Sequence, residues 1–457
     1  MNALVTTNRN VSRVVTGAAC CAVVIGALIA VRPAYGVAAL AALCFIPLVA
    51  GSVPLGIAVW LPAMFVVLGL ATTALQFLIV AAWLGCLIAR PATVRELLPG
   101  QRTLLAALGL LLAWLSLSVL WAREVSPAWH ELVLWLVAGG VLVVVATVTG
   151  RTGCVRLVMA AFVAGALLSV IVGLLGFGPA ETVVPGSLLS QSVAHRFSGA
   201  EGNPNELATQ LIVAIVFAGV LAADARRREL RLGLAAVALG LTVALAATES
   251  RGGLVAFAVA LVIAPLLFWR QRMPAVAAIG LVAIAAAGFF AASPGARDRV
   301  TEVNDGGAGR STLWAVAWRM AKDNAPEGVG LDNFRAVSPD YLRTPGSLRY
   351  AIQIDDPHVV HNEYLELLAE TGIVGLLLLL ALVGICLGAA RRAARAFEAL
   401  GRHDLARISR AVLLAGIGVL VAQVFASSAY DARLWALFAL GPALLAMATR
   451  VSWAVPR

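Results

Sequence analysis

The sequence predicts an all-α, polytopic transmembrane helical bundle of 12–14 helices with one large loop that contains short helices. Hydrophobic residues make up 61% of the 457 residues, charged residues make up 13%, and the mean hydropathy is +0.93. Apolar blocks follow one another with short charged joints, and about 20 apolar residues are enough to cross a bilayer core. Residues 293–361 hold no apolar run of that length. We therefore expect a membrane protein with one region outside the bilayer.

The spans divide the chain into three parts, with helices 1–11 in residues 1–292, the large loop in 293–363 and helices 12–14 in 364–457. The first apolar stretch is long and others follow at once, which favours a retained helix over a cleaved signal peptide. Prolines interrupt the second and third spans, and if both are lost, twelve helices remain and every later loop keeps its side. The expected spans are 14–31, 36–51, 54–70, 73–89, 103–121, 132–149, 154–177, 206–223, 231–248, 252–269, 275–292, 364–388, 411–428 and 434–449.

The charges indicate how the chain is oriented. With a cytoplasmic N-terminus, the cytoplasmic segments hold 21 of the 34 basic residues but five of the 24 acidic residues. This asymmetry follows the positive-inside rule and predicts that the large loop is extracytoplasmic and that both termini are cytoplasmic. The net charge of +10 comes from arginines scattered through the joints without an aromatic-basic cluster, so we expect no nucleic-acid partner.

The loop shows no disulfide or zinc spacing, because the six cysteines fall in predicted spans or at a cytoplasmic end: Cys20, Cys21, Cys44, Cys86, Cys154 and Cys386. Asp355 and Asp356 fit a divalent-ion site, but acidic turn residues before a proline are commoner. We therefore expect no metal and no cofactor.

A polar segment at residues 195–206 precedes the eighth predicted span. Its Asn203-Pro204-Asn205 run is a turn and cap signal, with Asn205 as the expected N-cap. Helix-start chemistry accounts for the asparagines but not for Arg196. The positive-inside bias disfavours an outer arginine unless an anion engages it.

A second polar segment, residues 249–253, is the whole connection between two predicted spans. Its two glycines allow close backbone approach, and a helix that begins near Gly252 would direct free N–H groups outward, which favours an anion. Alternatively, Glu249 and Arg251 form a local ion pair.

A third polar segment ends the large loop. Pro357 disfavours a helix at Asp356, so the next helix is expected to begin around His361 or Asn362. The dipole at a helix N-terminus disfavours imidazolium and would leave His361 as a neutral base. The alternative without a catalytic role is that His361 is packed in the protein or solvated.

Within the loop, residues 310–322 predict an amphipathic helix that Ser311 caps and that the turn at 326–330 ends. Tryptophans on the apolar face suit the outer membrane–water interface. The expected apolar stripe consists of Leu313, Trp314, Ala317, Trp318 and Ala321.

Four motifs in this order resemble the O-antigen ligase and polymerase superfamily of bacterial envelope enzymes. They are an arginine before an Asn-Pro-Asn segment (196–205), a Ser-Arg-Gly turn (250–252), an Arg…Trp…Pro-x-Gly-x-Gly…Phe stretch (310–334) and His-Asn-x-Tyr-Leu-x-x-x-x-Glu-x-Gly (361–372). Together they cover roughly residues 190–390. The first 190 residues show spans but no family motif.

The resemblance implies an inverting, metal-independent glycosyltransferase in the bacterial cytoplasmic membrane. Its partners would be an undecaprenyl diphosphate-linked glycan donor, a glycan or lipid-linked acceptor and the lipid bilayer. Arginine binds phosphate bidentately and can replace a metal beside the leaving group. The resemblance implies that Arg196, Arg251 and Arg310 bind the diphosphate and that His361 is the general base on the acceptor hydroxyl. The further substrate-binding residues that it implies are Asn203, Asn205, Glu363 and Tyr364.

The acceptor stays open at this point. A ligase uses lipid A-core, a polymerase uses another lipid-linked repeat, and a protein O-oligosaccharyltransferase uses Ser or Thr. Lys322 is the only lysine, a bias that suggests a high-GC bacterium, and many such bacteria lack lipopolysaccharide, which favours a polymerase. An anion transporter would need a continuous polar path, whereas the predicted spans are nearly free of ionisable residues. A purely structural scaffold would leave the outer arginines and His361 unexplained.

The orientation is testable by labelling. A cysteine introduced at Gly307 should react with a membrane-impermeant maleimide in intact spheroplasts, and one at Glu229, in a predicted cytoplasmic joint, only after lysis. The reverse pattern would overturn the orientation and every site assigned from it.

Overall fold

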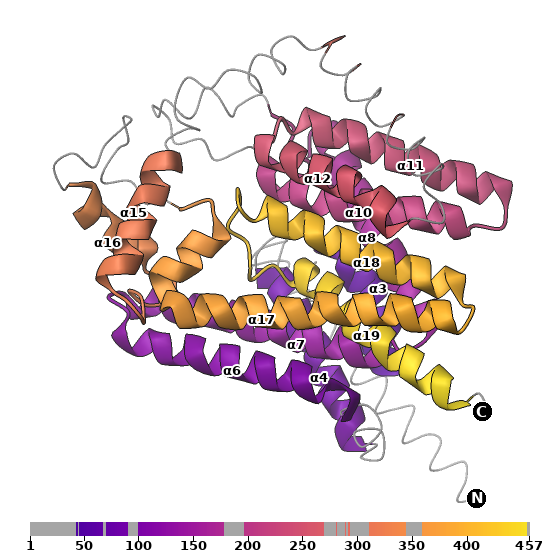
Figure 1. The fold of residues 1–457 in the computed structure, drawn as a ribbon, viewed down its shortest axis with the longest axis horizontal. Coiled ribbons are helices and arrows are strands. Elements are labelled where there is room, and N and C mark those ends of the chain that lie inside the picture. The colour runs from indigo at the N-terminus through magenta and orange to yellow at the C-terminus, as the bar shows by residue number, and fades with distance from the viewer. Residues whose placement is uncertain are drawn as a thin grey trace, which may run out of the picture.

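The computed structural model describes residues 45–66, 70–89, 99–177, 196–268, 310–343 and 359–454, with a few isolated positions besides. Within these ranges the regular elements are all helices, without a strand. Nine helices of the described chain are long and apolar enough to cross a membrane. The predicted all-α polytopic bundle is therefore confirmed (Figure 1).

The nine candidate spans follow the predicted order. They are α4 (Leu70–Ala89), α6 (Arg102–Ser118) with the 3₁₀ turn η2 (Val119–Trp121), α7 (Val125–Val148), α8 (Thr152–Leu174), α10 (Pro204–Asp224), α11 (Arg228–Ala247), α17 (Glu363–Ala399), α18 (His403–Ala422) and α19 (Ala432–Ala454). The remaining helices are shorter: α3 (Val53–Ala63), the 3₁₀ turn η1 (Pro99–Gln101), α12 (Arg251–Leu267), α15 (Arg310–Asp323) and α16 (Phe334–Leu342).

Several predicted boundaries were wrong. The span predicted at 54–70 is the 11-residue α3, which contains Pro62 and is too short to cross a bilayer core. Helices α7 and α18 begin before the predicted 132 and 411, and α17 continues past 388, because polar turns lower the hydropathy without breaking helical hydrogen bonds. The predicted spans 14–31, 36–51 and 275–292 lie wholly or mostly outside the described residues.

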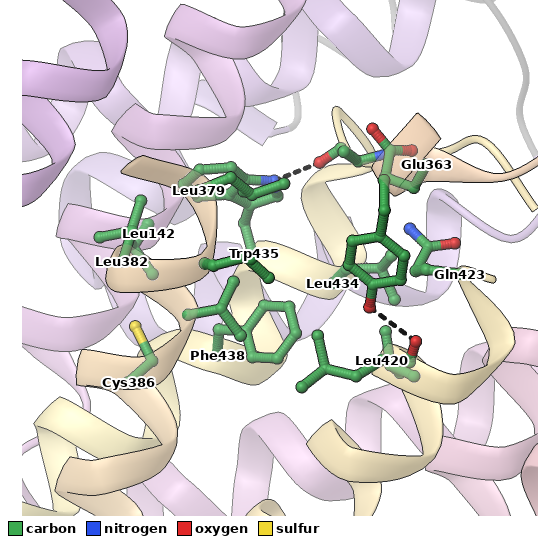
Figure 2. A pocket seen from close by; sticks show the side chains of 15 residues that line it. Leu142, Glu363, Leu379, Leu382, Cys386, Leu420, Gln423, Leu434, Trp435 and Phe438 are labelled. Atoms are coloured by element: carbon green, nitrogen blue, oxygen red, sulfur yellow. Dashed lines mark hydrogen bonds between the residues drawn. The ribbon is translucent and has the colours of Figure 1, made fainter. Parts of the chain in front are cut away.

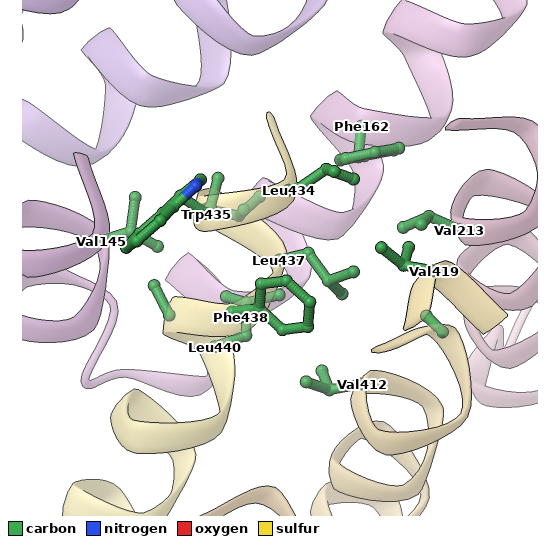
Figure 3. Close-up of a cluster of buried hydrophobic side chains, with 14 of the residues drawn as sticks. Val145, Phe162, Val213, Val412, Val419, Leu434, Trp435, Leu437, Phe438 and Leu440 are labelled. Atoms are coloured by element: carbon green, nitrogen blue, oxygen red, sulfur yellow. The ribbon is translucent and has the colours of Figure 1, made fainter. Parts of the chain in front are cut away.

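The bundle packs around its C-terminal helices. Helix α19 contacts α7, α17 and α18, and α10 contacts α8, α11 and α18. Figure 3 shows the core where side chains such as Val145, Phe162, Val213, Val419 and Phe438 converge. Since lipid is as apolar as leucine, such helices are held by close packing and polar contacts more than by apolar burial.

Ion pairs join three helices at the C-terminal end of α10. Asp224 lies 3.0 Å from Arg156 of α8 and pairs with Arg407 of α18, and its side chain is 6% exposed. Breaking a buried pair leaves an uncompensated charge, so these contacts fix α8, α10 and α18 relative to one another.

Helix α17 is broken at Gly372, which has φ +67°. We call residues 363–371 the outer segment of α17. Figure 1 shows α15, α16 and the start of α17 at one end of the molecule, with the C-terminal end of α19 at the other. A Cβ on Gly372 would lie 1.7 Å from the carbonyl oxygen of Pro326, so both the backbone angle and the contact require glycine.

Replacement of Gly372 should therefore destabilise the protein. Gly372→Ala should cost on the order of 1–3 kcal/mol and lower the Tm of the detergent-purified protein. The matched control is Gly384→Ala on the same helix, where an added Cβ meets nothing within 4 Å. Equal Tm values for the two variants would contradict the requirement at Gly372.

Candidate active site

Arg196 and the second polar segment meet at Asn205. Nε of Arg196 donates to the carbonyl oxygen of Thr248 (2.9 Å), and Nη2 donates to Oδ1 of Asn205 (3.0 Å). The same Oδ1 accepts from Oγ of Ser250 at 2.8 Å. Two motifs separated by about 50 residues are thus joined through one amide oxygen.

The cap of α10 differs from the prediction. Asn203, and not Asn205, is the N-cap, with its Oδ1 accepting from the backbone N–H of Asn205 (2.9 Å) and Glu206 (3.4 Å). Pro204 explains the difference, because proline favours the first helical position and the cap residue precedes it. The Asn205 side chain is left to bind Arg196.

The Ser-Arg-Gly turn begins helix α12, as predicted within a residue. Ser250 is the N-cap and accepts from the N–H of Gly253 at 3.1 Å, which makes Arg251 the first helical residue. A Cβ on Gly252 would lie 2.3 Å from Cβ of Phe425, so glycine allows the turn to lie directly against that ring. Phe425 belongs to residues 423–431, which we call the α18–α19 connection.

Phe425 links this turn to the segment that carries the candidate base. The ring of Trp314 on α15 lies 6.3 Å from the Phe425 ring, and Trp314 Nε1 donates to the carbonyl oxygen of Val360 at 3.1 Å. His361 follows directly, half-buried and with φ +52°. Arg310, the first residue of α15, lies one helical turn before Trp314.

The start of α17 agrees with the prediction. Asn362 is its N-cap, accepting from the N–H groups of Tyr364 and Leu365, both at 3.1 Å. The buried carboxylate of Glu363 accepts from the N–H groups of Ser428 and Ala429, both at 2.8 Å. Tyr364 donates its hydroxyl to the carbonyl oxygen of Leu420 at 2.7 Å. The first turn of α17 therefore holds the α18–α19 connection beside His361.

The large loop docks on the outer segment of α17. The N–H groups of Val329 and Gly330 donate to the carbonyl oxygens of Ala369 (3.0 Å) and Glu370 (2.7 Å). The Glu370 carboxylate accepts from the N–H groups of Asp332 and Phe334, both at 3.0 Å. A carboxylate at the start of α16 also complements the helix dipole.

A polar cavity lies beside the contact between the large loop and α17. It has a volume of about 400 Å³, and its polar lining includes Glu131, Asp332, Arg335, Glu366, Ser427 and Tyr430. Burial raises the pKa of Asp332, which Arg335 partly offsets. Among the described residues no group of His, Cys, Asp and Glu has the geometry to hold a metal ion.

A second cavity, of about 540 Å³, lies deeper in the bundle between α7, α17, α18 and α19. Figure 2 shows Leu379, Trp435, Phe438 and Leu420 around it, with Glu363 at one end. Its walls are almost entirely apolar, so it suits a hydrocarbon chain.

Comparison with known proteins identifies part of this region. The family described as O-antigen ligase matches residues 234–380. Those residues are therefore similar to an O-antigen ligase domain. The predicted resemblance to the O-antigen ligase and polymerase superfamily is thereby confirmed, and the match supports an enzyme of the ligase or polymerase type in a multi-pass membrane protein. No curated protein matches the chain.

The O-antigen ligase domain ends within α17, so the α18–α19 connection lies outside it although it contacts the motifs. Sequence reasoning missed this connection, because it placed 411–428 in a span. It also missed Arg433 of α19, which is 5% exposed and pairs with Glu201 and, at 2.8 Å, with Asp431. Arg433 is thus neutralised within the protein.

The loop helix α15 packs on protein more than predicted. Its buried face includes Leu313, Val316 and Met320, and Trp314 is turned toward Phe425. Trp318 is 51% exposed and lies outside that face. The cap prediction was wrong, because Ser311 is inside the helix and its Oγ is buried without a hydrogen bond among the described residues.

Trp314 and Trp318 should therefore differ in importance. Trp314→Ala removes the contacts with Phe425 and Val360 and should speed tryptic cleavage at Arg319 and Lys322 about tenfold, because cleavage follows local opening. Trp318→Ala, the matched control, should be cleaved at close to the wild-type rate. If Trp318→Ala were cleaved faster than Trp314→Ala, anchoring at the membrane interface would instead be the main role of the helix.

Proposed function

We propose that the protein is an inverting, metal-independent glycosyltransferase of the outer face of the bacterial cytoplasmic membrane. It transfers a glycan from undecaprenyl diphosphate to an acceptor hydroxyl, as a surface-polysaccharide polymerase or an O-antigen ligase. The supporting observation is that Phe425 and Trp314 connect the turn that carries Arg251 with the segment that carries His361. The O-antigen ligase domain supports the same class of reaction.

The donor side of the reaction falls to the arginines. As the bond between the anomeric carbon and the diphosphate oxygen breaks, negative charge grows on the leaving group. Guanidinium groups stabilise such charge through paired hydrogen bonds. Arg251 projects from the first turn of α12, whose N–H groups and dipole also favour an anion. Arg196 contacts Asn205 and Thr248, which fixes it beside that turn.

The acceptor side falls to His361. An acceptor hydroxyl attacks the anomeric carbon opposite the leaving diphosphate, and the imidazole takes its proton as the new glycosidic bond forms. A single displacement of this kind inverts the anomeric configuration. The apolar cavity beside Glu363 and Tyr364 offers room for part of an isoprenoid chain within the bundle.

Among the acceptors, a lipid-linked repeat remains our preferred choice over lipid A-core, on the arginine bias of the sequence. Protein O-glycosylation is the alternative within the same chemistry. A transporter is less well supported, because Arg433 and Asp224, two buried charged residues of the described spans, lie in ion pairs, and Glu363 is held by backbone N–H groups at a helix end.

Loss of the bidentate fork should damage the donor side. Arg251→Lys keeps the charge, yet turnover should fall on the order of 10²-fold, equivalent to about 3 kcal/mol for a strong charge-assisted contact. Arg343→Lys is the matched control, since the side chain of that arginine is exposed and pairs with Asp340 at 3.8 Å. If a well-folded Arg251→Lys variant turned over at the wild-type rate, Arg251 would not bind the diphosphate through its guanidinium fork and would contribute only its positive charge.

Loss of the base should spare donor binding. His361→Ala should bind the lipid diphosphate donor with near-normal affinity, while transfer falls by roughly 10²- to 10⁴-fold. His361→Gln offers a hydrogen bond without basicity and should be nearly as slow. Restored transfer with Gln, or loss of donor binding in step with turnover, would show that His361 positions substrate and that the base is another residue.

A further inference from the structure

The polar cavity at the outer end has no role in the donor chemistry just described. Four parts of the chain supply its polar walls. Glu131 lies on α7, Asp332 precedes α16, and Arg335 lies on α16. Glu366 lies on the outer segment of α17, and Ser427 and Tyr430 lie in the α18–α19 connection. Tyr430 is 40% exposed, so the cavity reaches the surface beside its ring.

The fold itself does not use all of the polar groups around this cavity. Glu363 and Glu370 also line it, but their carboxylates are taken up by backbone N–H groups. Glu366 is different. The residue is half-buried, and the Ser427 hydroxyl lies beside its carboxyl group, yet Oε2 of Glu366 is buried and lacks a hydrogen-bond partner among the described residues. An unsatisfied buried polar atom costs about 1–3 kcal/mol, so this atom points to a ligand that donates a hydrogen bond.

The charge of the cavity selects the class of ligand. Three carboxyl groups, those of Glu131, Asp332 and Glu366, face one guanidinium, that of Arg335. One guanidinium among three carboxyl groups offers a diphosphate too few cationic partners, so the donor head group does not belong here. A neutral polyol fits, because its hydroxyls can donate to carboxylates and accept from Arg335. The exposed ring of Tyr430 offers an apolar face with a polar tip at the rim, where one face of a sugar could pack.

The position of the cavity relative to His361 decides which substrate it serves. Val359, two residues before His361, lines the cavity, and Glu366 is five residues after it. The carbonyl oxygen of Val360, the residue before His361, accepts a hydrogen bond from Trp314. Trp314 lies against Phe425, and Phe425 lies against the turn that carries Arg251. His361 thus follows a residue that lines the cavity and a residue that contacts Trp314, so its backbone lies near both sites, and a base must reach a hydroxyl of the acceptor.

We propose that this cavity binds the acceptor sugar, with Glu366 and Tyr430 as specificity-determining residues that hold the ring whose hydroxyl is deprotonated by His361. This inference rests on the proposed glycosyl transfer. The inference extends that proposal by distinguishing two subsites, a cationic one for the lipid diphosphate and an acidic one for the neutral sugar.

The test separates the kinetics of donor and acceptor. The probes are the lipid-linked glycan as donor and, as acceptor, the methyl glycoside of the terminal sugar of the glycan isolated from the producing cells. In Glu366→Gln, the acceptor KM should rise about 10- to 100-fold, the equivalent of one hydrogen bond to a charged group, while the donor KM stays within twofold. Tyr430→Ala provides a second variant that leaves the buried carboxyls intact, and should raise the acceptor KM in the same way.

Glu398→Gln is the matched control, because Glu398 lies on the same helix but pairs with Arg410 far from the cavity. It should leave both KM values unchanged. An unchanged acceptor KM in Glu366→Gln and Tyr430→Ala, or an equal rise of both KM values, would overturn the acceptor subsite even with normal transfer by the wild type. A wild-type protein that transfers no glycan would instead overturn the proposed function.

Discussion

The break in α17 at Gly372 is the constraint on which the outer end of the molecule depends. The helix has to cross the membrane and also present its first two turns to the large loop, and one left-handed residue permits both. The carbonyl of Pro326 occupies the space that any side chain would need, so the loop fits only while the break is present. Glu370, two residues earlier, then holds the start of α16. His361, the loop and the polar cavity are thus positioned by one local geometry.

Glu363 separates two environments that a lipid-linked substrate would need. Its carboxylate is bound by two N–H groups of the α18–α19 connection, and the residue lines both cavities. On one side the walls are hydrocarbon, and on the other they carry carboxyl groups and Arg335. A buried carboxylate that is satisfied by backbone donors can form such a boundary without a counter-ion. An isoprenoid chain and a sugar could then lie on opposite sides of one residue.

Sequence periodicity predicted the helices but not the contacts between them. Hydropathy reports the apolar length of a span, so α8, α10 and α12 came within a few residues. The polar first turn of α7 lowers the hydropathy although it is helical, and the break at Gly372 leaves the hydropathy high although the helix is interrupted. Arg196, Ser250 and His361 were recognisable as exceptions to an apolar pattern. Phe425 and Arg433 were not, because each is ordinary in its own segment and makes its contacts with residues distant in sequence.

The central claim, a single displacement that uses arginines and a histidine base, is tested most directly by the stereochemistry of transfer. The purified wild-type protein, in detergent with EDTA, would be given a polyprenyl diphosphate-linked glycan of known anomeric configuration, and the new linkage would be assigned by NMR. The account predicts transfer under these conditions with inversion at the anomeric carbon. Retention of configuration, or transfer only after a divalent metal is restored, would contradict it.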